Sequence, residues 1–369
     1  MRHAELRAPH VLHVVPGLLP GGMELALTRV VNGLSGAMRH SVACLFGEPV
    51  IRALFPAGTE IHCFHARPNE VHLPWRLRQL LNRLEPTVIH ARNWGAWPDV
   101  ALARLLRRRR IPLIFSFHGV ENAGPMPLRR RVAFRVLPRL TTQLLAVSES
   151  SKLMLVGQYG WPSDRVLVIP NGVDTQRFCP APDEPGRPPL VVGAVGHLRR
   201  IKNHALLLEA CALLAQRGLD VELRIAGEGP EKPNLCRQAD ELGFRHCLHL
   251  PGHTADVVPF LRGLHVFVLS SDSEQHPNAL LEAMACGLAC VATRVGSVEE
   301  VLDGGRCGRI IEPGDGEGLA RALQDLAGDA GQRRDFGRAA RQRACESYRL
   351  DRMIAAYRRL YERLSRPAR

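Results

Sequence analysis

Residues 270–294 read SSDSEQHPNALLEAMACGLACVATR and decide the fold of this 369-residue chain. The preceding residues 265–269 are apolar and rich in β-branched and aromatic side chains, which predicts a buried strand. Asn278 is the predicted N-cap of a helix that stops at Gly287, and residues 289–293 form the next predicted strand. A strand, a helix and a strand within about 28 residues make a βαβ unit, which closes right-handed into a parallel sheet with its ligand crevice at the carboxyl ends of the strands.

The start of this helix is a predicted site for an anionic ligand, because helix N-termini leave amides unpaired and carry about half a positive charge. The predicted phosphate contacts are Asn278, Ala279, Leu280 and Leu281. Glu274 lies on the preceding loop and Glu282 one turn into the helix. A carboxylate can accept two hydrogen bonds from neighbouring hydroxyls, as a ribose or a sugar ring presents them. Taken singly, Glu274 is better explained as a solvated loop charge and Glu282 as a favourable first-turn acid; the surrounding motifs change that balance.

These surroundings resemble the retaining GT-B glycosyltransferases of family 4. Glu274 and Glu282 match the E-x7-E signature of that family, and the EAMACG helix follows them. Residues 195–203, VGHLRRIKN, resemble its G-R-L-x-x-x-K-N segment, and residues 225–230, IAGEGP, resemble its G-x-G-P turn. Nearer the amino end, the matching pieces are the glycine loop Gly21-Gly22, the acceptor-domain histidine His118 and the interdomain segment 169–174. The resemblance covers nearly the whole chain.

The resemblance implies an α/β fold of GT-B architecture, in which two doubly wound Rossmann-like domains face each other across a cleft. It implies a nucleoside-diphosphate sugar as donor, with UDP or GDP as the nucleotide, and no metal or other cofactor. Glu274 then orients the transferred sugar, Lys202 neutralises the departing diphosphate, and His118 lies near the transferred sugar. These three are the predicted catalytic residues. The further predicted donor contacts, besides Lys202, Glu282 and the helix start, are Gly21, Gly22, Arg199 and Arg200.

Lys202 also stands out without the resemblance, because the chain has 46 arginines and only three lysines. A lysine is a compact point charge that binds phosphate at close quarters, so its use in this motif favours a functional role over a solvated surface charge. Two departures from the family pattern bear on the site. His197 stands where an arginine is common, so either Arg199 or Arg200 would supply the second cation. Gln275 replaces a glycine, which predicts an altered donor preference.

A second set of polar residues follows a predicted strand in the first half of the chain. The predicted acceptor contacts are His90, the last residue of the strand predicted at 87–90, and Arg92, Asn93 and Trp94, which follow it. His118 ends another predicted strand, at its carboxyl end, where ligands bind in open α/β sheets. The alternative for His118 is a hydrogen-bonded residue that closes the strand.

The domain boundary is predicted from proline content. Residues 170–189 contain six prolines and lack the periodicity of a helix or a strand, which is typical of a linker. We therefore predict an acceptor-binding domain at 1–175, a linker at 176–189 and a donor-binding domain at 190–348. The resemblance implies that a final helix, in 349–369, crosses back to the first domain. Predicted strands in the two halves are 11–15, 87–90, 113–116 and 144–147, then 190–195, 222–225, 248–250, 266–269 and 290–293.

Charge and composition limit the partners and the compartment. Residues 1–175 hold 22 Lys and Arg against 11 Asp and Glu, a net charge of +11 out of +13 for the chain. The runs 107–110 and 129–131 could attract anionic lipid headgroups, or could simply be solvated helix ends. Only 5% of residues are aromatic and no recognition motif accompanies the charge, which disfavours nucleic acid. No long apolar stretch or signal peptide is found, so we expect a cytoplasmic protein, with the cytoplasmic face of the inner membrane as one expected location. The ten scattered cysteines predict reduced thiols.

The sequence thus predicts a retaining, metal-independent hexosyltransferase that acts on a lipid-linked or polysaccharide acceptor in cell-surface or exopolysaccharide biosynthesis. Two alternatives stay open. One is another GT-B enzyme, such as an epimerase or a phosphorylase. The other is a non-catalytic nucleotide-sugar-binding component of a polysaccharide assembly complex, for which His197 and Gln275 are the only hints.

Overall fold

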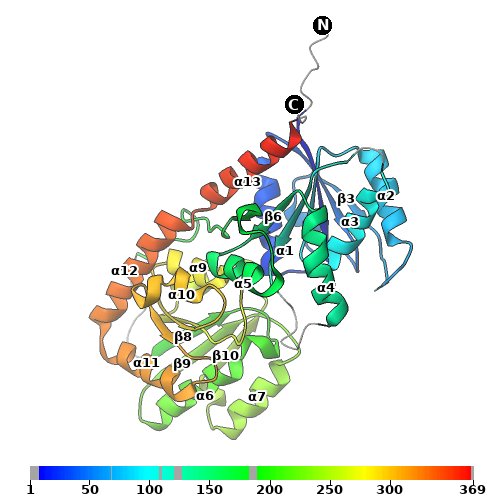
Figure 1. The fold of residues 1–369 in the computed structure, drawn as a ribbon. Coiled ribbons are helices and arrows are strands. Elements are labelled where there is room, and N and C mark those ends of the chain that lie inside the picture. Colours follow the sequence, from blue (N-terminus) through cyan, green and yellow to red (C-terminus); the bar gives the residue numbers. More distant parts are fainter. Residues whose placement is uncertain (1–7, 68, 108–109, 120–126, 183–188, 367–369) are drawn as a thin grey trace. The chain divides into compact units, whose positions relative to one another are not determined.

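The computed structural model describes residues 8–67, 69–107, 110–119, 127–182 and 189–366 (Figure 1). The chain divides into two compact units. The first unit combines Met1–Asn171 with Asp351–Arg369, and the second is Gly172–Leu350. Arg108 and Arg109 of the first arginine run and residues 183–188 of the predicted linker lie outside the described residues.

The first unit is built on a parallel sheet with the strand order β3-β2-β1-β4-β5-β6-β7. Its strands are β1 His10–Val15, β2 Arg39–Cys44, β3 Glu60–Cys63, β4 Val88–Arg92, β5 Leu113–Phe117, β6 Gln143–Ala146 and β7 Val166–Val168. Its helices are α1 Gly22–Leu34, α2 Leu73–Leu84, α3 Trp97–Leu105, α4 Leu128–Val136, α5 Glu149–Tyr159 and α13 Leu350–Ser365. The alternation of strands and helices is the doubly wound pattern that the sequence predicts.

The two faces of this sheet are packed differently. One face carries alternate residues such as Leu12, Ile89 and Phe115, which form an apolar core with α2 and α3. The other face has an apolar patch under α1 and, beside it, buried histidines that contact tyrosines of α13. Because α13 belongs to the first unit although it ends the chain, this polar row joins the carboxyl-terminal helix to the amino-terminal sheet.

The second unit repeats the arrangement with the strand order β10-β9-β8-β11-β12-β13, again with parallel pairs. Its strands are β8 Leu190–Val195, β9 Val221–Ala226, β10 Leu248–Gly252, β11 Val266–Leu269, β12 Ala289–Thr293 and β13 Arg309–Ile311. Its helices are α6 His204–Gln216, α7 Lys232–Glu241, α8 Val258–Arg262, α9 Asn278–Ala285, α10 Val298–Val301, α11 Gly316–Gly328 and α12 Ala330–Ser347. Apolar clusters cover both faces, one under α6 and α11 and the other under α9 and α12.

The unit boundary lies earlier than the sequence predicts. We expected a linker at 176–189, but the described part of that segment packs on the second unit. The Val173 amide donates to the Tyr348 carbonyl at 2.8 Å, and Phe178 is buried in the core beside α9 and α12. Arg341 of α12 donates to the carbonyls of Phe178 and Ala285 at 2.7 Å each. The described residues of this segment therefore pack on the second unit and do not form a free linker.

Four strands were not predicted, namely β2, β3, β7 and β13. β7 and β13 are three residues long, too short for alternation to be read. β2 carries His40 and Ser41, which are buried by tertiary packing that the local sequence does not indicate. β3 lies at the sheet edge and is only partly buried, so its apolar content is low.

Candidate functional site

The strand order of the second unit reverses between β8 and β11, and this is where the predicted site residues meet. Strands on the two sides of such a switch point send their connections in opposite directions, which leaves a crevice at their carboxyl ends. Lys202 lies in a short 3₁₀-helix, Arg200–Lys202, that follows β8, and Glu274 lies in the loop that follows β11. Residues 72 positions apart are thereby brought into contact.

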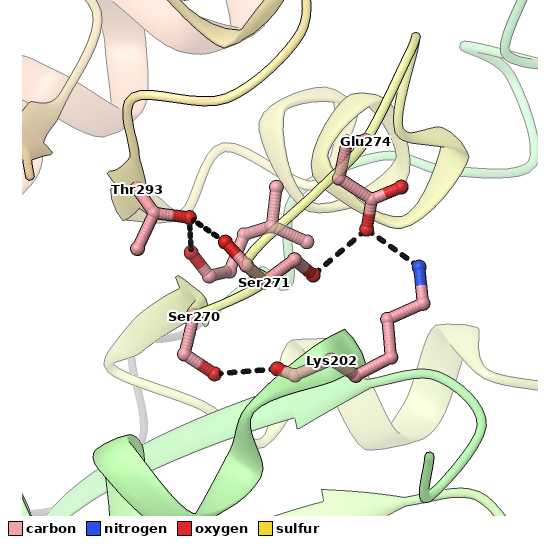
Figure 2. A network of polar contacts seen from close by, with 6 residues as sticks. Lys202, Ser270, Ser271, Glu274 and Thr293 are labelled. Carbon is pink, nitrogen blue, oxygen red and sulfur yellow. Dashed lines mark hydrogen bonds and ion pairs between the residues drawn. The ribbon is translucent and has the colours of Figure 1, made fainter. Parts of the chain in front are cut away.

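Lys202 and Glu274 form an ion pair, with 2.5 Å between Nζ and Oε1 (Figure 2). The Ser271 hydroxyl donates to the same carboxylate oxygen at 2.8 Å. The Lys202 side chain is 28% exposed and that of Glu274 is 12% exposed, so the pair is half-buried but accessible. A carboxylate that accepts two charge-assisted or hydroxyl hydrogen bonds at one oxygen is held in a fixed orientation and keeps its second oxygen for another donor.

The loops that carry this pair are tied to each other and to the next strand. The Ser270 hydroxyl donates to the Lys202 carbonyl at 3.0 Å, and Thr293 of β12 donates to the Ser271 carbonyl at 2.6 Å (Figure 2). Asn203, in the left-handed region at φ 45°, caps α6 through its side-chain oxygen and donates to Asp272 at 2.8 Å. Sequence reasoning missed these supporting roles of the serines and Thr293, although Asn203 follows Lys202 in the matching motif.

Two glycines permit close backbone approach in the loops that follow β9 and β12. Gly296, at φ 54°, lies so near the Glu274 loop that a Cβ there would come within 2.1 Å of the Glu274 carbonyl oxygen. Gly227 follows β9 at φ 157°, and a Cβ there would come within 1.9 Å of the Gly196 carbonyl oxygen. Ser297 also donates from its amide to the Gln275 carbonyl at 3.1 Å, so the backbone of the unusual Gln275 is held in place. Any side chain at position 296 or 227 would displace these loops.

The helix after Glu274 begins one residue earlier than predicted. Pro277 is the N-cap of α9 and Asn278 is its first helical residue, so the prediction of Asn278 as N-cap was wrong. Pro277 has extended backbone geometry there, at φ −75° and ψ 112°. The Leu281 amide donates to the Pro277 carbonyl at 3.3 Å, so it already has a partner within the helix, and the phosphate contact of Leu281 stays a prediction.

The remaining first-turn amides, those of Asn278, Ala279 and Leu280, have no helical carbonyl to bond. The Leu280 and Leu281 side chains are fully buried in the core, so only backbone atoms of Leu280 can reach a ligand. Glu282 lies one turn into α9 and is 8% exposed. Arg199 and Arg200 lie on the loop after β8 with exposed side chains, and neither forms an ion pair among the described residues.

In the first unit, the predicted donor and catalytic residues lie at the ends of β1 and β5. Gly21 is the N-cap of α1 and Gly22 is its first residue. A Cβ at Gly21 would come within 2.4 Å of the Glu24 carboxylate, so a larger residue would crowd the start of the helix. His118 follows β5, is partly exposed, and its Nε2 lies 2.8 Å from the Ser116 hydroxyl. Burial, followed by the charge of Arg92, lowers the pKa of His118 to about 3, so it is neutral at physiological pH.

Two of the predicted acceptor contacts are inaccessible. His90 and Arg92 are both 0% exposed, so the prediction that their side chains contact an acceptor was wrong. His90 is bonded at both nitrogens, to the Tyr361 hydroxyl at 2.8 Å and to the Ser116 hydroxyl at 2.9 Å. The Arg92 guanidinium stacks 5.5 Å from the ring centre of Tyr357. Both residues are inside β4, on the face that α13 covers, rather than beyond its end.

The other two acceptor predictions fare differently. Asn93 directly follows β4, is partly exposed, and has φ 62° and ψ 169°, a combination that residues other than glycine rarely adopt. Its amide donates to the Ser116 carbonyl at 2.9 Å. Trp94 stacks on Phe134 of α4 with ring centres 5.2 Å apart, and Arg130 lies 5.0 Å from its centre. Asn93 therefore remains the better candidate, while most of the Trp94 ring is used to pack α4.

Several further predictions concern chemistry outside this site. All ten cysteines are free thiols. In the ranges that the structure describes, no group of three or more His, Cys, Asp or Glu side chains is arranged to hold a metal ion. Among the same residues, no helix is long and apolar enough to cross a membrane.

Comparisons with known proteins agree on one family for both halves of the chain. Residues 20–177 match the family model described as Glycosyltransferase Family 4, and residues 189–329 match the one described as Glycosyl transferases group 1. The D-inositol 3-phosphate glycosyltransferase of Pseudarthrobacter chlorophenolicus is 32% identical over 91% of this chain and 90% of its own length. The putative glycosyltransferase EpsF of Bacillus subtilis is 32% identical over 80% of this chain and 81% of its own.

The fold has close counterparts among solved structures. The Anabaena protein HepE, solved in complex with UDP-glucose, superposes with a TM-score of 0.81 at 21% identity, covering 96% of this chain and 99% of that one. At that identity the similarity shows the fold alone. It places both sheets in the two-domain α/β arrangement predicted from the sequence.

Proposed function

Because this chain belongs to the group 1 glycosyltransferases and has their GT-B fold, we propose that it transfers a hexosyl group from a UDP- or GDP-linked sugar with retention of the anomeric configuration. Its relatives are glycosyltransferases of glycan biosynthesis, so glycosyl transfer itself follows from the family. The proposed acceptor is a hydroxyl of a lipid-linked or polysaccharide glycan, presented at the cytoplasmic face of the inner membrane. The donor, the acceptor and the stereochemistry are the parts that need testing.

The observation that carries the proposal is the Lys202–Glu274 pair at the β8–β11 switch point. The Lys202 ammonium has three N–H donors and Glu274 uses one of them, so a diphosphate oxygen can be held at the same time. Positive charge placed there stabilises the negative charge that develops on the departing diphosphate. The first-turn amides of α9 add a partial positive charge from the same unit. In this proposal, lysine and helix supply the stabilisation without a metal ion.

Glu274 is proposed to orient the sugar and not to act as a nucleophile. Its Oε1 already accepts hydrogen bonds from Lys202 and Ser271, and the second oxygen can accept from a sugar hydroxyl. The acceptor oxygen then forms a bond to the anomeric carbon on the face from which the diphosphate leaves. The bond between the anomeric carbon and the phosphate oxygen breaks, and that phosphate oxygen takes the acceptor proton. No protein-bound sugar is formed, and the configuration is kept.

The names of similar proteins support the choice of substrates. HepE was solved with UDP-glucose, and a Mycolicibacterium smegmatis relative, 30% identical over 67% of this chain, is named as a GDP-mannose-dependent mannosyltransferase. Named acceptors include D-inositol 3-phosphate and the lipopolysaccharide core. These names favour a nucleotide-linked hexose as the donor and a phosphorylated or lipid-linked acceptor.

A two-step experiment tests the proposal. A thermal-shift screen of UDP- and GDP-sugars first identifies the donor, which should raise the unfolding temperature. A transfer assay with that donor, polyol phosphate and lipid-linked acceptors, and product analysis by NMR then gives the anomer. An α-linked donor should yield an α-linked product, with no loss of rate in EDTA. A β-linked product would exclude retention, and tight donor binding without turnover on any acceptor would favour a non-catalytic binding component.

A further inference from the structure

The first unit exposes apolar side chains that the second does not. Among the described residues, every strongly exposed large hydrophobic side chain lies between Leu19 and Leu167, within the first unit. Three of them are on α4, where Leu128 is 74% exposed, Val132 is 53% exposed and Val136 is 46% exposed. Their spacing of four residues places them in one stripe along the helix.

This stripe faces away from the core. At about 100° per residue, Leu128, Val132 and Val136 lie within about 80° of one another around the helix axis. Phe134 is fully buried and lies about 200° from the centre of the stripe, packed against Trp94 and Trp97. A surface helix of a soluble domain normally turns its polar side to solvent. α4 instead buries one apolar side and exposes a second.

Arginines border the stripe on both sides. Arg129 lies on one edge, Arg131 and Arg135 lie on the other, and the helix LRRRVAFRV has no acidic residue. These three side chains are exposed and form no ion pair within the described part of the chain. A basic helix with an exposed apolar stripe has the composition of helices that lie in the plane of a membrane interface.

A pocket of arginines lies at the carboxyl end of the same helix. It is lined by Arg135, Pro138, Arg139, Gly160, Pro162 and Arg165, with no acidic residue among them. Arg165 donates to the Thr141 carbonyl and Arg139 donates to the Arg135 carbonyl at 3.2 Å, so two of the guanidinium groups are positioned by backbone contacts. Guanidinium groups are planar and match the oxygens of a phosphate group, so a pocket lined by three arginines suits an anionic headgroup.

We propose that α4 docks the enzyme on an anionic bilayer. Leu128, Val132 and Val136 enter the boundary between headgroups and acyl chains, the bordering arginines contact lipid phosphates, and the three-arginine pocket holds one anionic headgroup. The other basic run, 107–110, is left out of the proposal. Arg108 and Arg109 lie outside the described residues, and the α3 helix before the run exposes only two large apolar side chains, Leu102 and Leu105, against three on α4. The inference rests on the proposed function in one respect: a lipid-linked acceptor would lie in the same bilayer on which α4 docks.

Vesicle co-sedimentation of the full chain, without donor, tests the docking. Wild type should bind vesicles of phosphatidylcholine with phosphatidylglycerol and bind pure phosphatidylcholine vesicles at least tenfold more weakly. The triple variant Leu128→Gln/Val132→Gln/Val136→Gln should lose at least about tenfold in partitioning, since each buried methylene contributes to the affinity. The matched control Val50→Gln/Leu54→Gln removes apolar side chains of similar exposure elsewhere in the first unit and should bind like wild type.

The charge component is tested separately. Arg129→Gln/Arg131→Gln/Arg135→Gln should lower partitioning into the anionic vesicles by about fivefold per residue. The control Arg237→Gln/Arg306→Gln/Arg338→Gln removes the same charge from exposed sites of the second unit and should have little effect. Equal losses in this control, equal binding to both vesicle types, or unchanged binding of the stripe variant would overturn the proposal. Displacement from vesicles by soluble glycerol phosphate would also overturn it, because the pocket would then recognise a free phosphate.

The outcome is separable from that of the proposed function. Stripe and arginine variants should keep the thermal shift given by the donor and the rate of transfer to a soluble acceptor. A chain that turns over donor but ignores vesicles would refute only the docking. A chain that binds anionic vesicles through α4 but transfers no sugar would refute only the proposed function.

Discussion

The two sheets share one strand order but use its switch point differently. When each unit is numbered from its own first strand, the second sheet reads 3-2-1-4-5-6 and the first reads the same with a seventh strand added at the end. The order therefore reverses between β1 and β4 in the first unit and between β8 and β11 in the second. At β8–β11, Lys202 and Glu274 are in loops beyond the strand ends and remain accessible. At β1–β4, His90 and Arg92 are within the strand and lie under α13. At such a switch point, residues in the loop beyond the strand end reach the crevice, whereas residues within the strand remain covered by the packed helices.

The covered face of the first unit holds an unusual set of polar groups. His13, His40 and His90 are buried side by side with the Arg92 guanidinium, and His13 Nε2 lies 3.1 Å from His40 Nδ1. Burial, then the nearby cation or histidine, lowers the pKa of each of these histidines, that of His40 to about 4. Neutral imidazoles and tyrosine hydroxyls can exchange hydrogen bonds without burying more charge. The second unit has an accessible ion pair at its switch point, the proposed donor site, where the first has a buried polar row.

The largest expected difference between the two regions is the effect of Glu274→Ala on turnover. Loss of the sugar-orienting carboxylate should lower kcat by about 10²- to 10³-fold, as for other positioned polar groups in active sites. Steady-state kinetics with the identified donor and acceptor measure it. Glu317→Ala is the matched control, because it removes an exposed partner of Arg217 in the same unit and should leave the rate within about twofold. Near-normal transfer by Glu274→Ala would remove this residue from the site.

Lys202→Ala should have the next largest effect, a loss of about 10- to 100-fold in the single-turnover rate with weaker binding of the free nucleoside diphosphate. The physical reason is the lost charge at the departing diphosphate. Lys202→Arg should restore only part of the rate, since a guanidinium has a different shape from an ammonium. The effects of Lys202→Ala and Glu274→Ala should not add in the double variant, because the side chains are in contact. If the two rate losses add fully in the double variant, Lys202 and Glu274 act independently.

Acid should destabilise the first unit more steeply than the second. A buried histidine with a lowered pKa takes up a proton only in the unfolded chain, so below pH 6.5 stability falls as pH falls, by roughly 1 kcal/mol per pH unit for each histidine down to pH about 4. Besides the three histidines of the polar row, the first unit has His118, with a pKa of about 3, whereas the second has His204 and His276, at about 4. The free energy of unfolding of the first unit should therefore fall more than that of the second as the pH drops.

Urea unfolding at pH 7.5 and 5.5 checks this expectation. All four tryptophans, Trp75, Trp94, Trp97 and Trp161, lie in the first unit, so their fluorescence reports on it alone, while circular dichroism follows both units. The fluorescence midpoint should move further between the two pH values than the remaining dichroism transition. Equal shifts would mean that the polar row is solvated or protonated in the folded state.

Sequence patterns predicted most of the fold because period and turn signals are local. The strands β8 and β11 were predicted with the bounds that the structure has, and the E-x7-E and K-N motifs placed Glu274 and Lys202 in the correct loops. Their direct contact was not predicted, because it depends on β8 and β11 being neighbours. The acceptor prediction failed for His90 and Arg92 since β4 runs to residue 92, two residues beyond the predicted end. A strand boundary moved by two residues changes a crevice residue into a covered one.

Part of the site could not be read from local sequence at all. The tyrosines that cover His90 come from α13, more than 260 residues later, and only the family resemblance implied that this helix would cross back. Ser271 and Thr293 support the Glu274 loop through hydroxyl groups that are common anywhere in a chain. Such contacts are long-range, and no periodicity predicts them.

The smallest expected difference between the two units is in the free energy of unfolding lost when one tyrosine hydroxyl is removed from each. Tyr361→Phe removes the 2.8 Å hydrogen bond to His90 in the fully buried polar row and leaves an imidazole nitrogen without its partner, which should lower the unfolding free energy by about 1 to 2 kcal/mol. Tyr348→Phe in the second unit removes a 3.5 Å contact to the Glu300 carbonyl, at the limit of hydrogen-bond geometry, and should cost less than about 0.5 kcal/mol. Urea titrations followed by fluorescence and by dichroism measure the two. If both variants lose the same amount, α13 is held by its apolar contacts, and the buried histidines of the first unit contribute no more than any other packed surface.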